Sequence, residues 1–354
     1  MKKAENIIVG ISIGDLNGIG SEVVLKTFED ARMLELCTPV IFANVKMLSF
    51  VKKSFESTVM FHGIDTLDQI IIGKVNVLNV WREGFDIEYG VNSDVVGSYA
   101  IKSFVAATKA LKEGLVDVLV TAPINKYNVQ SEEFKFPGHT DYLNQELEGN
   151  ALMLMVQNNL RVGLLTDHVP VNEVASHLTA ALISQKIETV KQALIQDFNI
   201  NKPKIAILGL NPHAGDGGVI GKEDDEIIKP VIKKMFEKGT LVFGPYPADG
   251  FFGSGQYEKF DAVIATYHDQ GLIPFKTLSF GNGVNYTAGL NKIRTSPDHG
   301  TAFDIAGKGI ADFNSFKEAV YLAIDIFNAR NVYHDIASNP MKITKKEASS
   351  RRNE

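Results

Sequence analysis

The chain has 354 residues, of which 45% are hydrophobic and 22% are charged, and its formal net charge is −6. This composition is typical of globular proteins and excludes disordered and fibrous classes, while the acidic balance argues against binding to nucleic acid or to an anionic membrane. The single cysteine, Cys37, excludes an intrachain disulfide and favours a reducing, cytoplasmic location, and no apolar run reaches the roughly 20 residues of a membrane span.

Short apolar runs alternate along the chain with longer stretches whose apolar residues have helical spacing. The predicted strands are residues 7–14, 39–45, 74–80, 117–123, 151–157, 161–167, 204–210, 241–247 and 261–268. The predicted helices are residues 97–114, 171–198, 224–238 and 315–330. Strands that alternate with helices indicate βαβ units and a largely parallel sheet in an α/β protein. Residues 341–354 are polar and charged, and we expect a flexible tail there.

Three of the 8 histidines stand where a strand-like run stops, namely His168, His213 and His268. Ligands of open α/β sheets bind at the carboxyl ends of the strands, so three imidazoles there would hold a divalent metal and leave a position free for substrate. Neutral imidazole favours Zn, Co, Ni or Fe over Mg or Ca. Their spacing matches no short-range zinc motif, so a metal site and three separate structural histidines stay equally open.

Lysines, an arginine and glycines occur in the sequence segments before and after these histidines. Lys276 and Arg294 follow His268 in the chain, where they bind an anion or are ordinary solvated charges. Lys126 lies just beyond a predicted strand, as a catalytic acid or as a loop lysine. The segment GDLNGIG, residues 14–20, is similar to a phosphate-cradling turn. It lacks the complete G-x-G-x-x-G and the P-loop lysine, so a tight strand-to-helix turn explains it equally well.

Several sequence blocks occur in the order that is seen in the 4-hydroxythreonine-4-phosphate dehydrogenase family of the vitamin B6 route. They are GDLNGIGSE, TAPINK, PGHTDYL, GLNPHAGDGG, GPYPAD, YHDQGLIPFK, GVN and IRTSPDHGTAFDIAGKG. The resemblance extends from about Gly14 to Gly309. Within it, HGTAFDIAGKG also resembles the adenosine-binding loop of the isopropylmalate and isocitrate dehydrogenases. The first block departs from the family's usual GDPAGIGPE, which puts the fine substrate preference in doubt.

The resemblance implies a two-lobed α/β/α fold of the isocitrate and isopropylmalate dehydrogenase type, not a Rossmann fold, with the active site in the cleft between the lobes. Residues 1–127 and 270–340 would form the nucleotide-binding lobe. Residues 128–269 would form the lobe that carries the metal and substrate sites and makes the dimer contacts. The family works as a homodimer whose site lies at the subunit interface, so one metal ligand is expected from the neighbouring chain.

The resemblance also assigns roles to individual positions. The metal ligands of the family are matched by His168, His213 and His268. Its substrate-binding positions are matched by His139, Thr140, Lys276, Asn285 and Arg294. The nucleotide loop supplies the cofactor-binding positions His299, Gly300, Thr301, Asp304 and Gly307. Lys126 and Asp249 are alternative proton donors, and Asp249 and Asp269 are candidates to orient the metal-bound imidazoles.

The activity that the resemblance implies is a metal-dependent oxidation and decarboxylation that uses NAD or NADP and one Zn, Mg or Co ion per site. The expected substrate is 4-phosphooxy-L-threonine, and the expected products are 3-amino-2-oxopropyl phosphate and CO2. A sister dehydrogenase that acts on 4-phosphothreonate or 4-phosphoerythronate is the first alternative. The second is a non-catalytic regulator that binds a metal and a nucleotide. We expect neither nucleic acid nor membrane as a partner.

Overall fold

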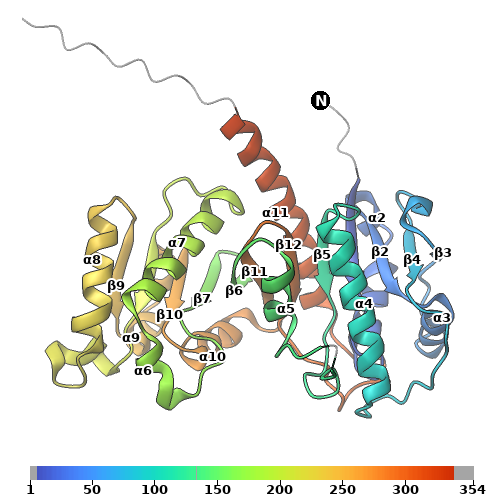
Figure 1. Ribbon diagram of the computed structural model, residues 1–354, viewed down its shortest axis with the longest axis horizontal. Helices are drawn as coiled ribbons and strands as arrows, with labels where there is room; N and C mark the ends of the chain where they lie inside the picture. Colours follow the sequence, from blue (N-terminus) through green and yellow to red (C-terminus); the bar gives the residue numbers. More distant parts are fainter. Residues whose placement is uncertain (1–5, 133, 339–354) are drawn as a thin grey trace, which may run out of the picture.

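The computed structural model describes residues 6–132 and 134–338, and the predicted tail at 341–354 lies outside the described residues. One sheet of 12 strands runs across the described molecule (Figure 1). The strands are β1 (Ile7–Ser12), β2 (Cys37–Ala43), β3 (Phe61–Ile64), β4 (Val75–Asn79), β5 (Val118–Thr121), β6 (Gly149–Gln157), β7 (Leu160–Leu164), β8 (Ile205–Leu208), β9 (Val242–Tyr246), β10 (Ala262–Ala265), β11 (Val284–Leu290) and β12 (Ile293–Pro297).

The order of strands in this sheet is β3-β4-β2-β1-β5-β12-β11-β6-β7-β10-β8-β9. The first six strands of this order, β3, β4, β2, β1, β5 and β12, are parallel to one another. The last four, β7, β10, β8 and β9, are also parallel to one another. In the middle, β11 is antiparallel to β12 and to β6, and β6 is antiparallel to β7. The predicted largely parallel α/β sheet is confirmed. Its antiparallel centre and its strand order differ from the 3-2-1-4-5-6 order of a Rossmann fold.

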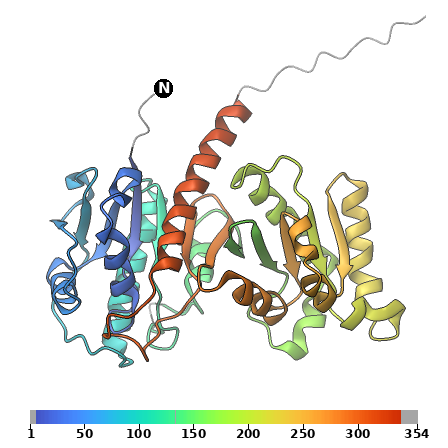
Figure 2. The same ribbon diagram turned by 180° about the vertical axis from the view of Figure 1, so that it is seen from behind.

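Helices cover both faces of the sheet (Figures 1 and 2). They are α1 (Gly20–Glu29), α2 (Met33–Leu36), α3 (Val45–Ser54), α4 (Asp94–Lys112), α5 (His139–Glu146), α6 (Val174–His177), α7 (Ala180–Gln196), α8 (Lys229–Glu237), α9 (Ala248–Gly253), α10 (His268–Ser279) and α11 (Asn314–Ser338). Short 3-10 turns are η1 (Leu67–Gln69), η2 (Val171–Glu173), η3 (Pro212–Gly218) and η5 (Gln256–Lys259), and a π-helical turn, η4 (Asp224–Ile228), precedes α8. Among the described residues, no helix is both long and apolar enough to cross a membrane.

All nine predicted strands and all four predicted helices are present. The predicted helix 171–198 is broken into η2, α6 and α7, and the predicted helix 224–238 begins with the π-helical turn η4. Three strands were not predicted, namely β3, β11 and β12. The boundaries of the two lobes stay a prediction.

The long helix α11 packs against β12, β11 and β5 at the centre of the sheet (Figure 2). A buried polar network fixes this contact. Arg330 of α11 donates from Nε to Oδ1 of Asp197 at 2.7 Å and from Nη2 to the hydroxyl of Tyr286 at 3.0 Å. That hydroxyl donates to Oδ2 of Asp197 at 2.6 Å. Burial raises the pKa of Tyr286 well above its usual value, which keeps the phenol a donor. The network joins α11, β11 and the end of α7.

Candidate active site

A cavity of about 290 Å³ opens near the carboxyl ends of β5, β7 and β10. The first turns of α5 and α10 also face it, because each of these helices begins with a histidine that lines the cavity. Ten of the residues predicted from the sequence line this cavity, namely Lys126, His139, Thr140, His168, His268, Lys276, Asn285, Arg294, His299 and Gly300. The structure therefore gathers most of the predicted metal- and substrate-binding positions in one place.

Arg294 is the buried cation of the cavity, with 2% of its surface exposed. Its guanidinium donates from Nη2 to Oγ1 of Thr121 at 2.6 Å and from Nη1 to Oγ1 of Thr287 at 3.1 Å. None of the ion pairs within the described ranges includes Arg294. Burial without a compensating charge lowers the pKa of this guanidinium. An anionic ligand would supply the missing charge.

His139 lies beside this guanidinium as a neutral imidazole. Nη2 of Arg294 lies 3.1 Å from Nδ1 of His139. A guanidinium can only donate, so Nδ1 accepts and the proton of the neutral ring is on Nε2. Burial, together with the positive charges of Arg294 and Lys126, lowers the pKa of His139 well below its usual value. Nε2 is buried and has no hydrogen-bond partner in the described part of the chain, so its N–H is free for a ligand.

Two acceptors in the cavity are also without partners among the described residues, Oδ1 of Asn285 and Nε2 of His299. Nδ1 of His299 lies 3.0 Å from the carbonyl oxygen of Gly300. Because a carbonyl only accepts, Nδ1 carries the proton and Nε2 has the lone pair. Each unpaired buried polar group costs about 1–3 kcal/mol, so the cavity is built for a ligand that both accepts and donates hydrogen bonds.

The lysines of the cavity are exposed, unlike Arg294. Nζ of Lys276, on α10, donates to the carbonyl oxygen of Asp298 at 3.2 Å. Lys126 lies in the loop after β5. Both ammonium groups remain hydrated and add positive charge without the desolvation that Arg294 carries.

His168 and His268 line the same cavity, with ring centroids 6.3 Å apart. His268 begins α10, and its Nδ1 donates to Oδ1 of Asp269 at 2.7 Å. A carboxylate at this distance only accepts, which leaves the lone pair on Nε2 for a metal and fixes the ring. The predicted contact of Asp269 is therefore present. His168 and His268 are thus the two predicted metal ligands that a single chain brings into one cavity.

His213 is not brought to the other two histidines within one chain. It is exposed and lies outside the lining of the cavity. Six consecutive residues of η3, from His213 to Gly218, have positive φ. The buried carboxylate of Asp224 holds the preceding loop by accepting from the backbone N–H groups of Leu210 at 2.8 Å and Asn211 at 3.0 Å. Across residues 6–132 and 134–338, no three His, Cys, Asp or Glu side chains form a group that could hold a metal ion.

The other predicted residues lie outside the cavity lining. Asp249 is exposed on α9. Thr301, Asp304 and Gly307 belong to the loop between β12 and α11. Their predicted roles as proton donor and as nucleotide contacts therefore depend on ligands or chains that approach the cavity from outside.

The sequence did not single out Thr121 and Thr287, the two residues that hold the guanidinium. A threonine in a strand carries no functional signal by itself, because β-branched residues are common there for conformational reasons. Only their position across the sheet from Arg294 identifies them. Thr121 ends β5, and Thr287 lies within β11.

Comparisons with known proteins match this architecture. The family model described as pyridoxal phosphate biosynthetic protein PdxA matches residues 35–323. The 4-hydroxythreonine-4-phosphate dehydrogenase of Bacteroides thetaiotaomicron is 48% identical, over 95% of this chain and 93% of its own length. The D-threonate 4-phosphate dehydrogenase of Cupriavidus necator is 35% identical, over 91% of this chain and 98% of its own length.

A solved structure of 4-hydroxythreonine-4-phosphate dehydrogenase from Klebsiella pneumoniae superimposes with a TM-score of 0.79 at 31% identity. The match covers 92% of this chain and 99% of that one, and it supports the α/β fold that the sequence predicted. Sequence, fold and family model agree over most of the chain. The chain therefore belongs to the PdxA family of pyridoxal phosphate biosynthetic proteins.

Proposed function

We propose that the protein is a cytoplasmic, NAD-dependent dehydrogenase that oxidises and decarboxylates 4-phosphooxy-L-threonine to 3-amino-2-oxopropyl phosphate and CO2. The observation that carries the proposal is the buried Arg294 guanidinium, which faces the cavity without a carboxylate partner among the described residues. A dianionic phosphate supplies the missing negative charge, and its oxygens suit the planar donor fork of an arginine.

The free N–H at Nε2 of His139 donates a further hydrogen bond to the phosphate, and Lys276 adds a hydrated positive charge. The acceptors Oδ1 of Asn285 and Nε2 of His299 are suited to the ammonium or hydroxyl group of the same molecule. The substrate thus offers partners to polar atoms of the cavity that have none among the described residues.

NAD, when bound, would supply the oxidant and would accept the hydrogen of C3 as hydride, while the hydroxyl at C3 loses its proton. The C1–C2 bond of the resulting β-keto acid then breaks, CO2 leaves, and the electron pair stays on C2. Lys126 lines the cavity and is the proton donor that we propose for C2, in preference to the more remote Asp249. A divalent ion at His168 and His268 would stabilise negative charge on the substrate oxygens as a Lewis acid.

We further propose that the protein is a homodimer in which the partner subunit's His213 completes the metal site. The support is that His168 and His268 lie together while His213 is exposed elsewhere on the same chain. This arrangement makes a specific prediction for mixed dimers. His213→Ala and His268→Ala are each expected to be nearly inactive alone.

When the two inactive variants are refolded together, each mixed dimer has one site with all three histidines. Random pairing should restore about a quarter of the wild-type activity. A mixture of His168→Ala and His268→Ala is the matched control, since both changes fall in the same site and nothing should be restored. Failure of the first mixture to recover, with dimers present by light scattering, would contradict a shared site.

A second candidate substrate is D-threonate 4-phosphate, because the relative from Cupriavidus necator carries that name at 35% identity. The two substrates differ in whether an ammonium or a hydroxyl group meets the unpaired acceptors of the cavity. NADH formation should be measured from both compounds, with and without added Zn²⁺ or Mg²⁺. A higher kcat/KM for 4-phosphooxy-L-threonine supports the proposal, and a higher value for D-threonate 4-phosphate replaces it. Binding without turnover of either compound would favour a regulator.

A further inference from the structure

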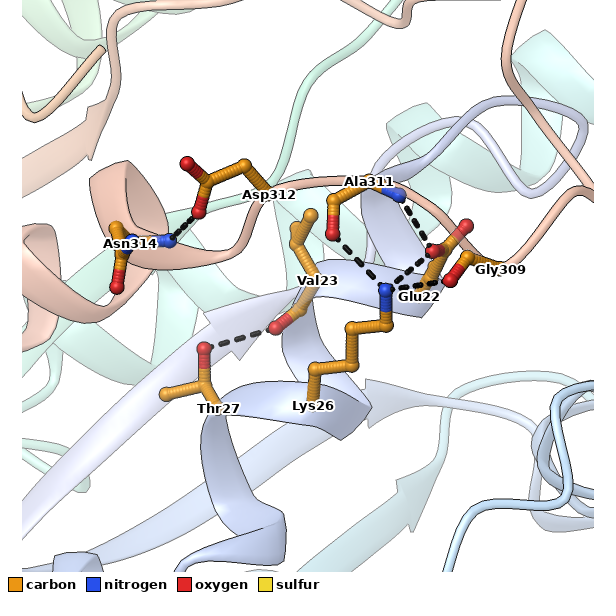
Figure 3. Close-up of polar contacts among 8 residues, drawn as sticks. All are labelled: Glu22, Val23, Lys26, Thr27, Gly309, Ala311, Asp312 and Asn314. Carbon is orange, nitrogen blue, oxygen red and sulfur yellow. Dashed lines mark hydrogen bonds and ion pairs between the residues drawn. The ribbon is translucent and has the colours of Figure 1, made fainter. Parts of the chain in front are cut away.

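The loop of residues 298–313, which joins β12 to α11, is tied to helix α1 by two side chains (Figure 3). Nζ of Lys26 donates to the carbonyl oxygens of Gly309 and Ala311, each at 2.9 Å. Oε1 of Glu22, one turn earlier on α1, accepts from the backbone N–H of Ala311 at 2.8 Å. The same Oε1 lies 2.8 Å from Nζ of Lys26. We refer to these two residues as the Glu22–Lys26 clamp.

The clamp holds the loop with a carboxylate and an ammonium group that are both largely removed from water. The side chain of Glu22 is 0% exposed and that of Lys26 is 25% exposed. All three donors of the ammonium group have acceptors, whereas Oε2 of Glu22 is buried without a partner among the described residues. Buried ion pairs add little net stability compared with apolar packing. Their effect on the loop is selective, because another conformation of the loop would remove two acceptors from the Lys26 ammonium and one donor from the Glu22 carboxylate.

The first half of the loop is fixed to the turn before α1. The carbonyl oxygen of Thr301 accepts from the N–H of Ile19 at 3.0 Å. A Cβ on Gly18 would lie 2.8 Å from that oxygen, so the close approach requires glycine. This contact explains a glycine of the GDLNGIG segment without a phosphate. The segment is a strand-to-helix turn on which the 298–313 loop rests.

Two of the five residues that the resemblance assigns to the nucleotide, Asp304 and Gly307, lie between these two attachments. Asp304 and Gly307 are exposed there, on a stretch anchored at Thr301 on one side and at Gly309 and Ala311 on the other. We propose that Glu22 and Lys26 are positioning residues for the dinucleotide. They act through Gly309 and Ala311 and keep the loop in its binding conformation before the nucleotide arrives. This inference rests on the proposed function, because it requires the loop to bind NAD.

The test replaces the ammonium group and keeps most of its aliphatic stem, in Lys26→Met. The dissociation constant for NAD⁺, measured by calorimetry, should rise about tenfold, because the loop loses two hydrogen bonds from a charged donor. The KM for NAD⁺ should rise similarly, while the KM for 4-phosphooxy-L-threonine stays at the wild-type value. Lys26→Arg keeps the charge and should recover part of the affinity. Lys109→Met removes an exposed helix pair with Glu113 and is the matched control, with no expected effect.

Lys26→Met leaves the buried Glu22 carboxylate unpaired and lowers stability, so a second variant separates stability from positioning. Glu22→Gln combined with Lys26→Met removes both charges, and its Tm should return towards that of the wild type. Its affinity for NAD⁺ should remain weak, because Gly309 and Ala311 still lack the ammonium. Wild-type NAD⁺ affinity in the double variant would overturn the positioning role, as would equal losses for NAD⁺ and substrate. Wild-type protein that binds neither NAD⁺ nor NADP⁺ would instead overturn the proposed function.

Discussion

At one end of the cavity, Arg294 is 2% exposed and is hydrogen-bonded to threonines on two strands. At the other end, His168 and His268 lie beyond the ends of their strands, and the side chain of His268 is 43% exposed. The arginine end is built from the sheet itself. The histidine end is built from segments that leave the sheet and face solvent.

The two ends differ in how many of the groups needed to bind a ligand the single chain provides. The donors around Arg294 are oriented before any ligand arrives, because strands hold side chains more rigidly than loops do. The ligand there needs only to bring charge. The histidine end holds two imidazoles and the Asp269 carboxylate, and it lacks a third ligand within the described residues. In the function that we propose, the first end is complete in a single chain and the second needs a partner subunit, so their variants should fail in different ways.

The largest effect is expected from Arg294→Met. The kcat/KM for 4-phosphooxy-L-threonine should fall about a thousandfold, since truncating one partner of a buried charge pair costs about 2–5 kcal/mol. The loss should be much smaller for unphosphorylated 4-hydroxy-L-threonine. Arg161→Met is the matched control, because Arg161 is also buried but stacks on Phe198, outside the lining of this cavity. Equal losses on both substrates would remove the anion-binding role.

A smaller effect is expected at the histidine end from Asp269→Asn. This variant keeps the size of the side chain and removes the carboxylate charge on Nδ1 of His268. Affinity for Zn²⁺, measured by competition with a chelator, should fall about 10- to 100-fold. Asp65→Asn, at an exposed pair with Arg82, is the control and should bind Zn²⁺ like the wild type. Unchanged Zn²⁺ affinity in Asp269→Asn would mean that the ion does not use His268.

The smallest effect concerns pH. The folded-state pKa of His139 is lowered, so below its unfolded value the unfolded chain takes up a proton that the folded chain refuses. Protonation of His139 therefore does not affect the free energy of unfolding above about pH 7.5. As the pH falls through about 6.5, protonation of the unfolded chain lowers that free energy. Urea unfolding at pH 7.5 and 5.5 should show an extra loss of up to about 1.4 kcal/mol in the wild type relative to His139→Gln. The same pH dependence in both proteins would argue against a neutral His139.

The sequence correctly placed in the cavity several polar residues that stand at or just after the end of a predicted strand. Residues 118–120 and 262–265 are apolar throughout, because strands buried on both faces need no alternation, and each run lies in a strand of the structure. Polar residues directly after such runs reach the same edge of the sheet. This is why Lys126, His168 and His268 line one cavity.

The strands β11 and β12 were not predicted, because they carry polar residues that line the cavity. Asn285 and Arg294 interrupt their apolar pattern, since these side chains serve the cavity and not the core. The spacing of the histidines also could not show that His213 stands apart. It lies five residues past the end of β8, as Lys126 does past β5, but it stands in the left-handed turn η3 and does not line the cavity. Distances of that kind depend on loop conformation, which periodicity does not report.

The left-handed turn at His213 has a consequence for engineering. His213, Ala214 and Asp216 all have positive φ, at 55°, 51° and 44°. Conformations of this kind cost about 1–3 kcal/mol each in non-glycine residues. A search for thermostable variants would therefore favour glycine at Ala214 and Asp216. Such variants should resist heat better but hold the imidazole of His213 less firmly, so the metal-binding role that we propose for His213 should weaken as heat resistance rises.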